Sequence, residues 1–251
     1  MAVCSYSILN DIHFPYESPL YYKALSQIES YQNLQGIILN GDIAEIESAS
    51  SHPKGPNARN RLIEEIAYLN EKLDEIQKRF PDVPIAYICG NHEHRIFRFL
   101  RDQASVLFGY LDMPVLLKLT ERKNFRFFEY APDQLVKVGK CRDLYARHEP
   151  LAGGQMHAKG TAEKAVVSII YGHTHVYQSY THKKFGPSPY SVTAISNGFL
   201  GDITKPIFEY RGCKDNWQEG HMKINCDDVT GEYECHFQAL YRPRTDILVS
   251  L

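Results

Sequence analysis

The sequence predicts an α/β fold in which two β-sheets pack face to face and helices cover their outer surfaces. Strand-like and helix-like runs alternate as far as Phe108, an order that favours parallel strands with helices packed outside the sheet. Beyond Leu116 short strand-like runs predominate, which predicts a second sheet. Because 43% of the 251 residues are apolar, the chain can bury a full core, and we expect a single domain over residues 1–251.

The first half of the chain carries the alternating pattern. Strands are expected near residues 3–9, 36–39 and 84–88, and helices over about 20–31 and 95–108. A longer helix begins near Asn57, a candidate N-cap, and ends at Phe80-Pro81. Its apolar residues recur every three or four positions and form one face: Leu62, Ile66, Leu69, Leu73 and Ile76.

The second half is rich in short β-type runs. Strands are expected near residues 125–129, 135–138, 142–147, 166–171, 190–195, 221–225 and 233–241, with one helix near 156–165. Trp217, the only tryptophan, is expected to pack in the core or at its edge rather than to serve as a base-stacking platform. No internal repeat or flexible linker divides the chain.

Charge and hydropathy argue against two classes of partner. The 28 Lys and Arg residues nearly balance the 30 Asp and Glu residues, so the net charge of -2 gives no general attraction to long nucleic acid. No apolar run is long enough to span a bilayer. We therefore expect neither duplex DNA nor a membrane as the partner, and the oligomeric state stays open.

The cysteines and the N-terminus favour a cytoplasmic protein. The six cysteines show no CxxC spacing, and the chain runs directly into a candidate site at Asp11 without the pattern of a signal peptide. Cys226 and Cys235 flank a predicted turn and could face each other across a hairpin, but two free thiols are the favoured interpretation.

Five clusters of metal-binding side chains fall where predicted strands end, the edge at which α/β sheets collect ligands. These clusters are Asp11-Ile12-His13, Gly41-Asp42, Gly90-Asn91-His92-Glu93, His148 and Gly172-His173-Thr174-His175. Asp11 and His13 are two positions apart, so extended backbone would point both at one cation, and the same argument applies to His173 and His175. The glycines suit a sharp turn or a close approach to an ion. Mixed carboxylate, amide and imidazole donors favour Mn, Fe, Zn, Co or Ni over Ca.

The order D-x-H, G-D, G-N-H-E, H and G-H-x-H resembles the calcineurin-like metallophosphoesterase superfamily, and these motifs span Asp11 to His175. The resemblance implies a four-layer α/β/β/α sandwich of two mixed sheets flanked by helices. It also implies two divalent metal ions, with manganese favoured and Co, Ni, Fe, Zn or Mg as alternatives. One ion would be held by Asp11, His13, Asp42 and His175, and the second by Asp42, Asn91, His148 and His173. His148 is followed by Glu149 where the family often has glycine.

The resemblance also implies roles in catalysis. Two cations can bind the attacking and leaving regions of a phosphoryl displacement, and a hydroxide shared between them would attack phosphorus directly. His92 would donate a proton to the leaving oxygen. Glu45 takes the position of the carboxylate that orients this histidine in the family pattern G-D-x-x-D, and Glu93 is the competing partner.

The candidate substrate contacts are Asn91, Arg95, Arg98 and His52. Arg95, Arg98 and Arg101 recur every three residues and form a basic stripe beside the predicted metals. Ser/Thr protein phosphatases usually carry arginines where this chain has Cys89 and Ile46, which argues against that function.

Three stretches of the sequence narrow the predicted class of substrate. The segments at 90–95, 198–202 and 217–220 resemble phage-encoded members of the superfamily, some of which remove the 5′-phosphate from deoxynucleotides. The prediction is a phosphomonoesterase acting on (deoxy)nucleoside 5′-monophosphates, in the host cytoplasm if the protein is encoded by a phage. The alternatives are a phosphodiesterase or exonuclease on DNA and, from a different class, a non-catalytic binding scaffold.

Overall fold

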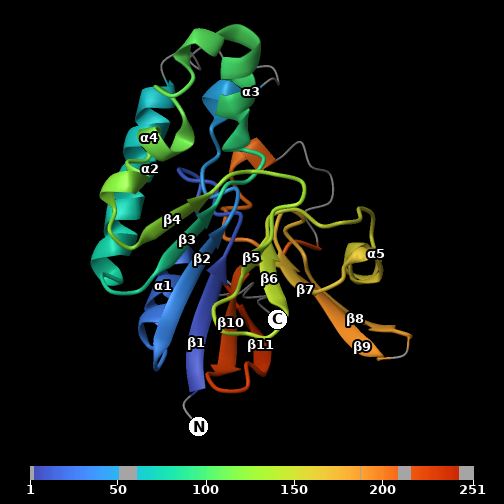
Figure 1. The fold of residues 1–251 in the computed structure, drawn as a ribbon. Helices are drawn as coiled ribbons and strands as arrows, with labels where there is room; N and C mark the ends of the chain where they lie inside the picture. Colours follow the sequence, from blue (N-terminus) through green and yellow to red (C-terminus); the bar gives the residue numbers. More distant parts are fainter. Residues whose placement is uncertain (1–2, 51–60, 187, 209–215, 243–251) are drawn as a thin grey trace, which may run out of the picture.

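The computed structural model describes residues 3–50, 61–186, 188–208 and 216–242, and it confirms two mixed sheets flanked by helices (Figure 1). The first sheet has six strands in the order β11-β10-β1-β2-β3-β4. Their bounds are β1 Val3–Leu9, β2 Leu34–Asn40, β3 Ile85–Ile88, β4 Phe125–Phe128, β10 Gly220–Asp227 and β11 Tyr233–Ala239. Strands β1 to β4 run parallel, whereas β10 and β11 form an antiparallel hairpin at one edge.

The second sheet has five strands in the order β5-β6-β7-β9-β8. Their bounds are β5 Val136–Lys137, β6 Leu144–Arg147, β7 Ser168–Tyr171, β8 Tyr177–Lys184 and β9 Tyr190–Asn197. Strands β6, β7 and β9 are parallel, and the edge strands β5 and β8 pair antiparallel with their neighbours.

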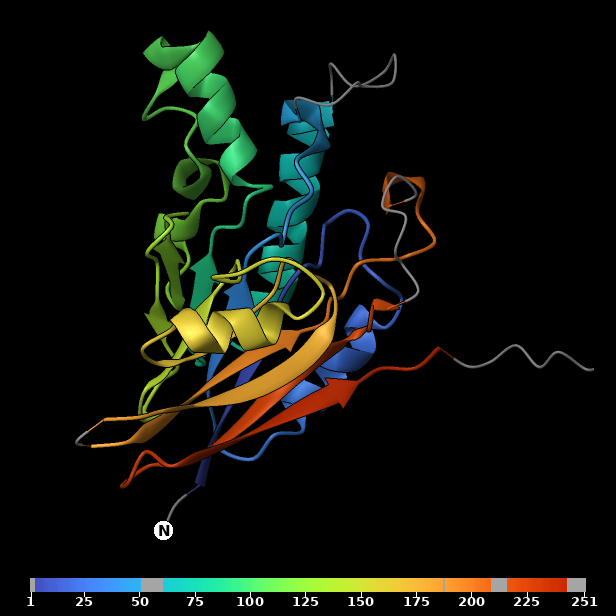
Figure 2. The same ribbon diagram turned by 90° about the vertical axis from the view of Figure 1, so that its right-hand side faces the viewer.

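Helices cover the outer faces of both sheets. Their bounds are α1 Tyr21–Glu29, α2 Arg61–Arg79, α3 His94–Gln103, α4 Met113–Leu116 and α5 His157–Lys164, with short 3-10 turns at Glu47–Ala49, Ser105–Leu107, Leu119–Glu121 and Pro206–Phe208. Helices α1 and α2 lie on one side of the two sheets and α5 lies on the other (Figure 1). Figure 2 shows α5 across β8 and β9, both of which it contacts. No described helix is long and apolar enough to cross a membrane.

The alternation of side chains along each strand separates three apolar layers. In β2, Ile37 and Leu39 pack toward the helices, whereas Ile38 faces the second sheet. In β7, Ile170 faces the first sheet, whereas Ile169 and Tyr171 pack beneath α5. Strands β2 and β7 therefore carry apolar side chains on both faces. Each sheet can pack against the other sheet on one face and against helices on the other, which gives four layers.

Two details differ from the sequence-based expectations, and a third falls outside the described residues. The helix expected over 95–108 ends at Gln103, and a 3-10 turn follows. Strand β8 was not predicted, because an edge strand with alternating polar residues lacks an apolar run. Asn57, the expected N-cap of α2, lies outside the described residues.

The cysteines at the β10-β11 hairpin are free, as expected. Cys226 pairs with Tyr233 and Cys235 pairs with Ile224, so the two cysteines do not face each other across the hairpin. The other described cysteines, Cys4, Cys89 and Cys141, are also free thiols.

We predict that the apolar layer between the sheets dominates stability. Ile170→Ala, at a side chain with 0% exposure, should lower the free energy of unfolding by about 2–5 kcal/mol because it leaves a cavity. Ile63→Ala is the matched control, since Ile63 is 81% exposed on α2. Urea denaturation measures both, and equal losses would contradict the assignment of this layer as core.

Candidate metal centre

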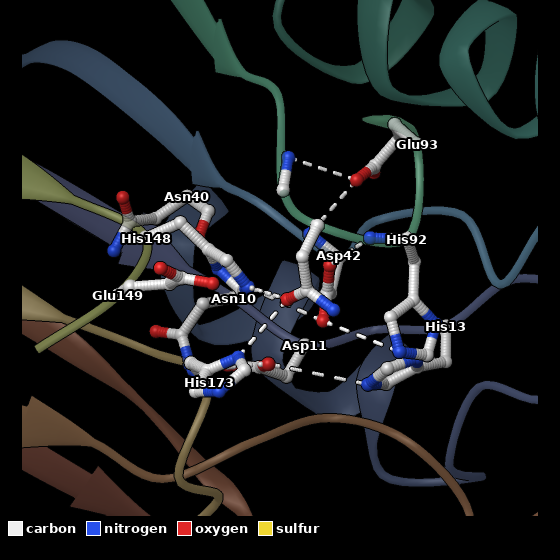
Figure 3. Close-up of polar contacts among 12 residues, drawn as sticks. Asn10, Asp11, His13, Asn40, Asp42, His92, Glu93, His148, Glu149 and His173 are labelled. Atoms are coloured by element: carbon white, nitrogen blue, oxygen red, sulfur yellow. Dashed lines mark hydrogen bonds and ion pairs between the residues drawn. The ribbon is translucent and has the colours of Figure 1, made fainter. Parts of the chain in front are cut away.

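The five donor clusters meet at one end of the sandwich (Figure 3). Loops after β1, β2 and β3 of the first sheet supply Asp11, Asp42 and Asn91, and loops after β6 and β7 of the second sheet supply His148 and His173. Parallel strands end at the same edge of a sheet, which is why residues far apart in the sequence converge. The centre therefore lies where the two sheets meet.

Backbone hydrogen bonds continue the strand pairing into these loops. The N–H of Asp11 donates to the carbonyl of Gly41 at 3.1 Å, and the N–H of His13 donates to the carbonyl of Asp42 at 3.0 Å. In the second sheet, Gly172 N–H donates to the His148 carbonyl at 2.9 Å. Each donor side chain is thus positioned by the neighbouring strand as well as by its own.

The backbone at five donor residues is left-handed rather than extended. The φ angles are 51° at Asp11, 56° at His13, 48° at Asp42, 68° at His173 and 61° at His175. This conformation is uncommon for residues other than glycine and costs about 1 kcal/mol or more each. The extended backbone predicted for D-x-H and H-x-H is therefore wrong. Strain concentrated at one set of donors indicates a functional site.

The first donor cluster contains Asp11, His13 and His175. The Nε2 atom of His175 lies 3.3 Å from Asp11 Oδ1 and 3.3 Å from Nε2 of His13. The Nε2 of His13 lies 4.0 Å from the same carboxylate oxygen. Two imidazole nitrogens and one carboxylate oxygen thus face a common point, as the ligands of a cation do.

The second donor cluster contains Asp42, Asn91, His148 and His173. Asn91 Oδ1 lies 3.0 Å from His148 Nε2 and 2.9 Å from His173 Nδ1, and His148 Nε2 lies 3.2 Å from Asp42 Oδ2. His173 and His175 therefore belong to different clusters. The spacing argument that placed both on one cation is wrong, whereas the ligand sets implied by the family resemblance separate them in the same way.

The far nitrogens of two imidazoles are held by acceptors. His13 Nδ1 donates to Glu45 Oε2 at 2.8 Å, and His148 Nδ1 donates to the Asn40 carbonyl at 3.0 Å. Such partners fix the tautomer and leave the lone pair of Nε2 for a metal.

Asn10 supports Asp11, since its Nδ2 donates to Asp11 Oδ2 at 2.7 Å. Neither Asn10 nor Asn40 was predicted as a site residue, although both stand immediately before a donor motif at the end of a strand.

Two glycines have no room for a side chain, as expected from a close approach. A Cβ on Gly172 would lie 2.4 Å from Asp11 Oδ2, and one on Gly90 would lie 2.2 Å from the backbone nitrogen of Asp42. Because glycine has no side chain, each of these positions leaves room for a donor residue, Asp11 or Asp42, that follows a neighbouring strand.

The two buried carboxylates at the centre, Asp11 and Asp42, require positive charge beside them. Burial alone would raise the pKa of Asp11, but His175 lowers it by hydrogen bonding and charge. Burial alone would also raise the pKa of Asp42, but His148 and His92 hold it well below its usual value. Burial alone would lower the pKa of His148, yet Asp42 raises it to about 10. Both buried carboxylates are therefore charged at neutral pH, and bound cations would replace the protons on these imidazoles.

His92 lies beside the clusters, against Glu45. Its Nδ1 is 2.9 Å from Glu45 Oε2, the oxygen that also accepts from His13, although the contact with His92 lacks the alignment of a hydrogen bond. Arg95 Nη1 contacts Glu45 Oε1 at 2.9 Å, and Arg95 Nη2 donates to His92 Nε2 at 2.9 Å. Burial alone would raise the pKa of Glu45, but bonding to His13 and His92 depresses it well below its usual value.

Glu93 has a different set of partners. Its carboxylate accepts backbone N–H groups of Asp42, Ile43, Ala44 and Gly90 at 2.7–3.1 Å, and the hydroxyl of Tyr87 at 3.0 Å. Glu93 therefore holds the loop that carries Asp42. Of the two carboxylates that competed in the sequence-based prediction, Glu45 is the one that contacts the His92 ring.

The remaining predicted residues are placed as follows. Asn91 is half-buried between His148 and His173. Arg95 is buried, with 8% of its surface exposed, so it does not belong to the exposed basic stripe that was predicted, whereas Arg98 lies on the surface. His52 lies outside the described residues.

Comparison with known proteins agrees with the site. A family model described as calcineurin-like phosphoesterase matches residues 7–177, which include every predicted metal ligand. The chain belongs to this family. The family resemblance inferred from the motifs is thereby confirmed. No curated protein matches the chain.

Solved structures similar to this chain include Vps29 proteins. A single mutant of Vps29 from Entamoeba histolytica is 12% identical, covers 94% of this chain and 99% of its own, and has a TM-score of 0.39. Vacuolar Protein Sorting 29 from Cryptosporidium parvum is 11% identical, covers 96% and 100%, and has a TM-score of 0.43. At these TM-scores the likeness carries no argument about function.

We predict that the two clusters bind separate ions that share Asp42. Asp11→Ala should reduce bound Mn from about two ions per chain to about one, because only the first cluster loses a ligand. Asp42→Ala should weaken both sites. Metal analysis after dialysis measures the stoichiometry, and His236→Ala, at an imidazole with 46% of its side chain exposed, is the control. Retention of both ions in Asp42→Ala would contradict the shared ligand.

Proposed function

We propose that this protein is a metal-dependent phosphoesterase that hydrolyses (deoxy)nucleoside 5′-monophosphates. The observation that carries the proposal is the pair of donor clusters on either side of Asp42, with His92 beside both. Asp42 Oδ1 accepts the backbone N–H of His92 at 2.9 Å, and Asp42 Oδ2 lies 3.7 Å from Nε2 of the His92 ring. The loop that carries His92, the candidate proton donor, is thus hydrogen-bonded to Asp42, the residue that would be a ligand of both ions.

The donor sets suit two divalent ions such as manganese, because each combines carboxylate and imidazole ligands and the second adds the amide oxygen of Asn91. Asp11, His13, Asp42 and His175 would hold one ion, and Asp42, Asn91, His148 and His173 the other. Such ions supply a water of lowered pKa and neutralise charge on the phosphoryl oxygens.

The other residues act on the leaving group. His92 would give a proton to the leaving oxygen from Nε2, since Nδ1 lies against Glu45; this requires Nε2 to be protonated and to release the N–H of Arg95 that it accepts here. Glu45 orients the ring and is itself held by Arg95 at both its carboxylate and its backbone carbonyl. Arg95 also brings positive charge to 2.9 Å from His92 Nε2, where it would stabilise negative charge developing on the leaving oxygen.

Several features support a small phosphomonoester as substrate. All seven predicted ligands and His92 are present, which argues against a non-catalytic scaffold. The net charge of -2 argues against long nucleic acid, and Cys89 and Ile46 stand where protein phosphatases carry arginine. The free thiols of the described cysteines are in keeping with a cytoplasmic location.

We predict that the Mn-loaded protein releases phosphate chiefly from 5′-mononucleotides, and that a chelator abolishes the reaction. His92→Ala should lower kcat about 10²–10⁴-fold, the range for loss of a general acid, with both metal ions retained. Phosphate release from 5′- and 3′-nucleotides, p-nitrophenyl phosphate, its diester and linear DNA is the measurement. Preference for the diester or DNA would assign the protein as a phosphodiesterase, and no turnover on any substrate with metals bound would favour a scaffold.

A further inference from the structure

Three aromatic side chains surround the first donor cluster. Trp217 meets His175 edge to face, with ring centroids 4.3 Å apart and an interplanar angle of 81°. Phe199 stacks on His175 at 5.0 Å, and Phe208 lies 5.3 Å from the ring of His13. The imidazoles of this cluster are therefore backed by an apolar wall.

Burial distinguishes the three rings. Phe199 and Phe208 are 0% and 2% exposed, so they serve as backing. Trp217 is half-buried and packs on them at centroid distances of 5.1 and 5.8 Å. The indole ring thus lies beside His175 of the first donor cluster without being fully enclosed, and its contacts with Phe199 and Phe208 fix its position. A rigid aromatic ring with one free portion suits recognition of a planar ligand.

The wall adjoins the side of the centre where the leaving group departs. The ring of His92, the candidate proton donor, lies 4.8 Å from the ring of His13, and Phe208 packs on that same imidazole. Beside the second cluster, Glu149, next to His148, accepts a hydrogen bond from Tyr130 at 2.7 Å. Among the described residues, no aromatic ring stacks on or meets edge to face the imidazoles of His148 and His173, apart from their contact with each other. An apolar leaving group therefore finds its matching surface beside the first cluster.

The wall comes from a part of the chain outside the family match. Phe199, Phe208 and Trp217 all follow residue 177, where the match ends. Residues up to 177 supply the donors and His92, which serve any phosphoester. Segments added after a shared catalytic core are the usual place for specificity.

We infer that Trp217 binds the aromatic base of the substrate's leaving group, so that the site selects nucleotides over phosphate esters without an aromatic group. This inference rests on the proposed phosphoesterase function and identifies the residue that gives it specificity. Trp217 was expected from the sequence to be a packing residue, and its inner side does pack. The base would pack on the part of Trp217 that its aromatic neighbours leave uncovered.

The test compares two ligands that differ only in the base. Zn-loaded His92→Ala protein is titrated by calorimetry with deoxyadenosine 5′-monophosphate and with deoxyribose 5-phosphate. The nucleotide should bind about 10-fold more tightly, the size of one base-stacking contact. Trp217→Leu in the same background should remove this preference, and Trp217→Phe should restore part of it. Because Trp217 is the only tryptophan, the nucleotide should also change the intrinsic tryptophan fluorescence more than deoxyribose phosphate does.

Three results would overturn the inference: equal weakening of both ligands in Trp217→Leu, loss of bound zinc in that variant, or no preference for the nucleotide in the parent protein. The first two would make Trp217 a support for His175 only. Binding is measured without turnover, so the two proposals fail separately. If wild-type protein binds the nucleotide through Trp217 but hydrolyses nothing, the proposed function fails, and of the inference only the contact between Trp217 and the base stands.

Discussion

Asp11 and Asp42 are buried, with 0% and 2% of their surfaces exposed, at the point where the two sheets meet. A buried carboxylate is stable only when positive charge and hydrogen-bond donors surround it. His175 and His148 lie 3.3 and 3.2 Å from these carboxylates, and the N–H of His173 donates to Asp11 at 2.8 Å. The need to compensate two charges in one small volume explains why imidazoles from the second sheet converge on carboxylates from the first.

The same requirement shapes the backbone. Asp42 has a φ of 48°, and its loop is held by the carboxylate of Glu93, which accepts N–H groups from three consecutive residues starting at Asp42. Hydrogen bonds to a charged acceptor contribute about 1.5–3 kcal/mol each, enough to offset the strain of one left-handed residue. Burial and the charge of Asp42 raise the pKa of Glu93, so the anchor of this loop is electrostatically linked to the residue that it positions.

Much of the fold and of the site could be predicted from the sequence because both depend on local pattern. Apolar runs located nearly every strand, and donors placed directly after them had to meet at one edge of the sheets. The left-handed backbone at Asp11 and His13 could not be predicted, because hydrogen bonds to the neighbouring strand impose it.

The choice between Glu45 and Glu93 was open in the sequence because Glu45 takes the position of the orienting carboxylate in the family pattern, whereas Glu93 directly follows His92. The direction of Arg95 also depends on tertiary structure, since the buried face of α3 turns it toward Glu45 and away from Arg98. The aromatic wall at Trp217 was missed because its rings are distant in sequence from the donors they contact.

The central claim is that this end of the sandwich holds two cations, one on each side of Asp42. Anomalous diffraction from crystals grown with manganese tests it directly. Two bound ions should give two peaks about 3.5–4 Å apart, the spacing of two-metal phosphoesterase sites, with Asp42 between them. Asp11, His13 and His175 should contact one peak, and Asn91, His148 and His173 the other. A single peak, or peaks bound by other residues, would contradict the account.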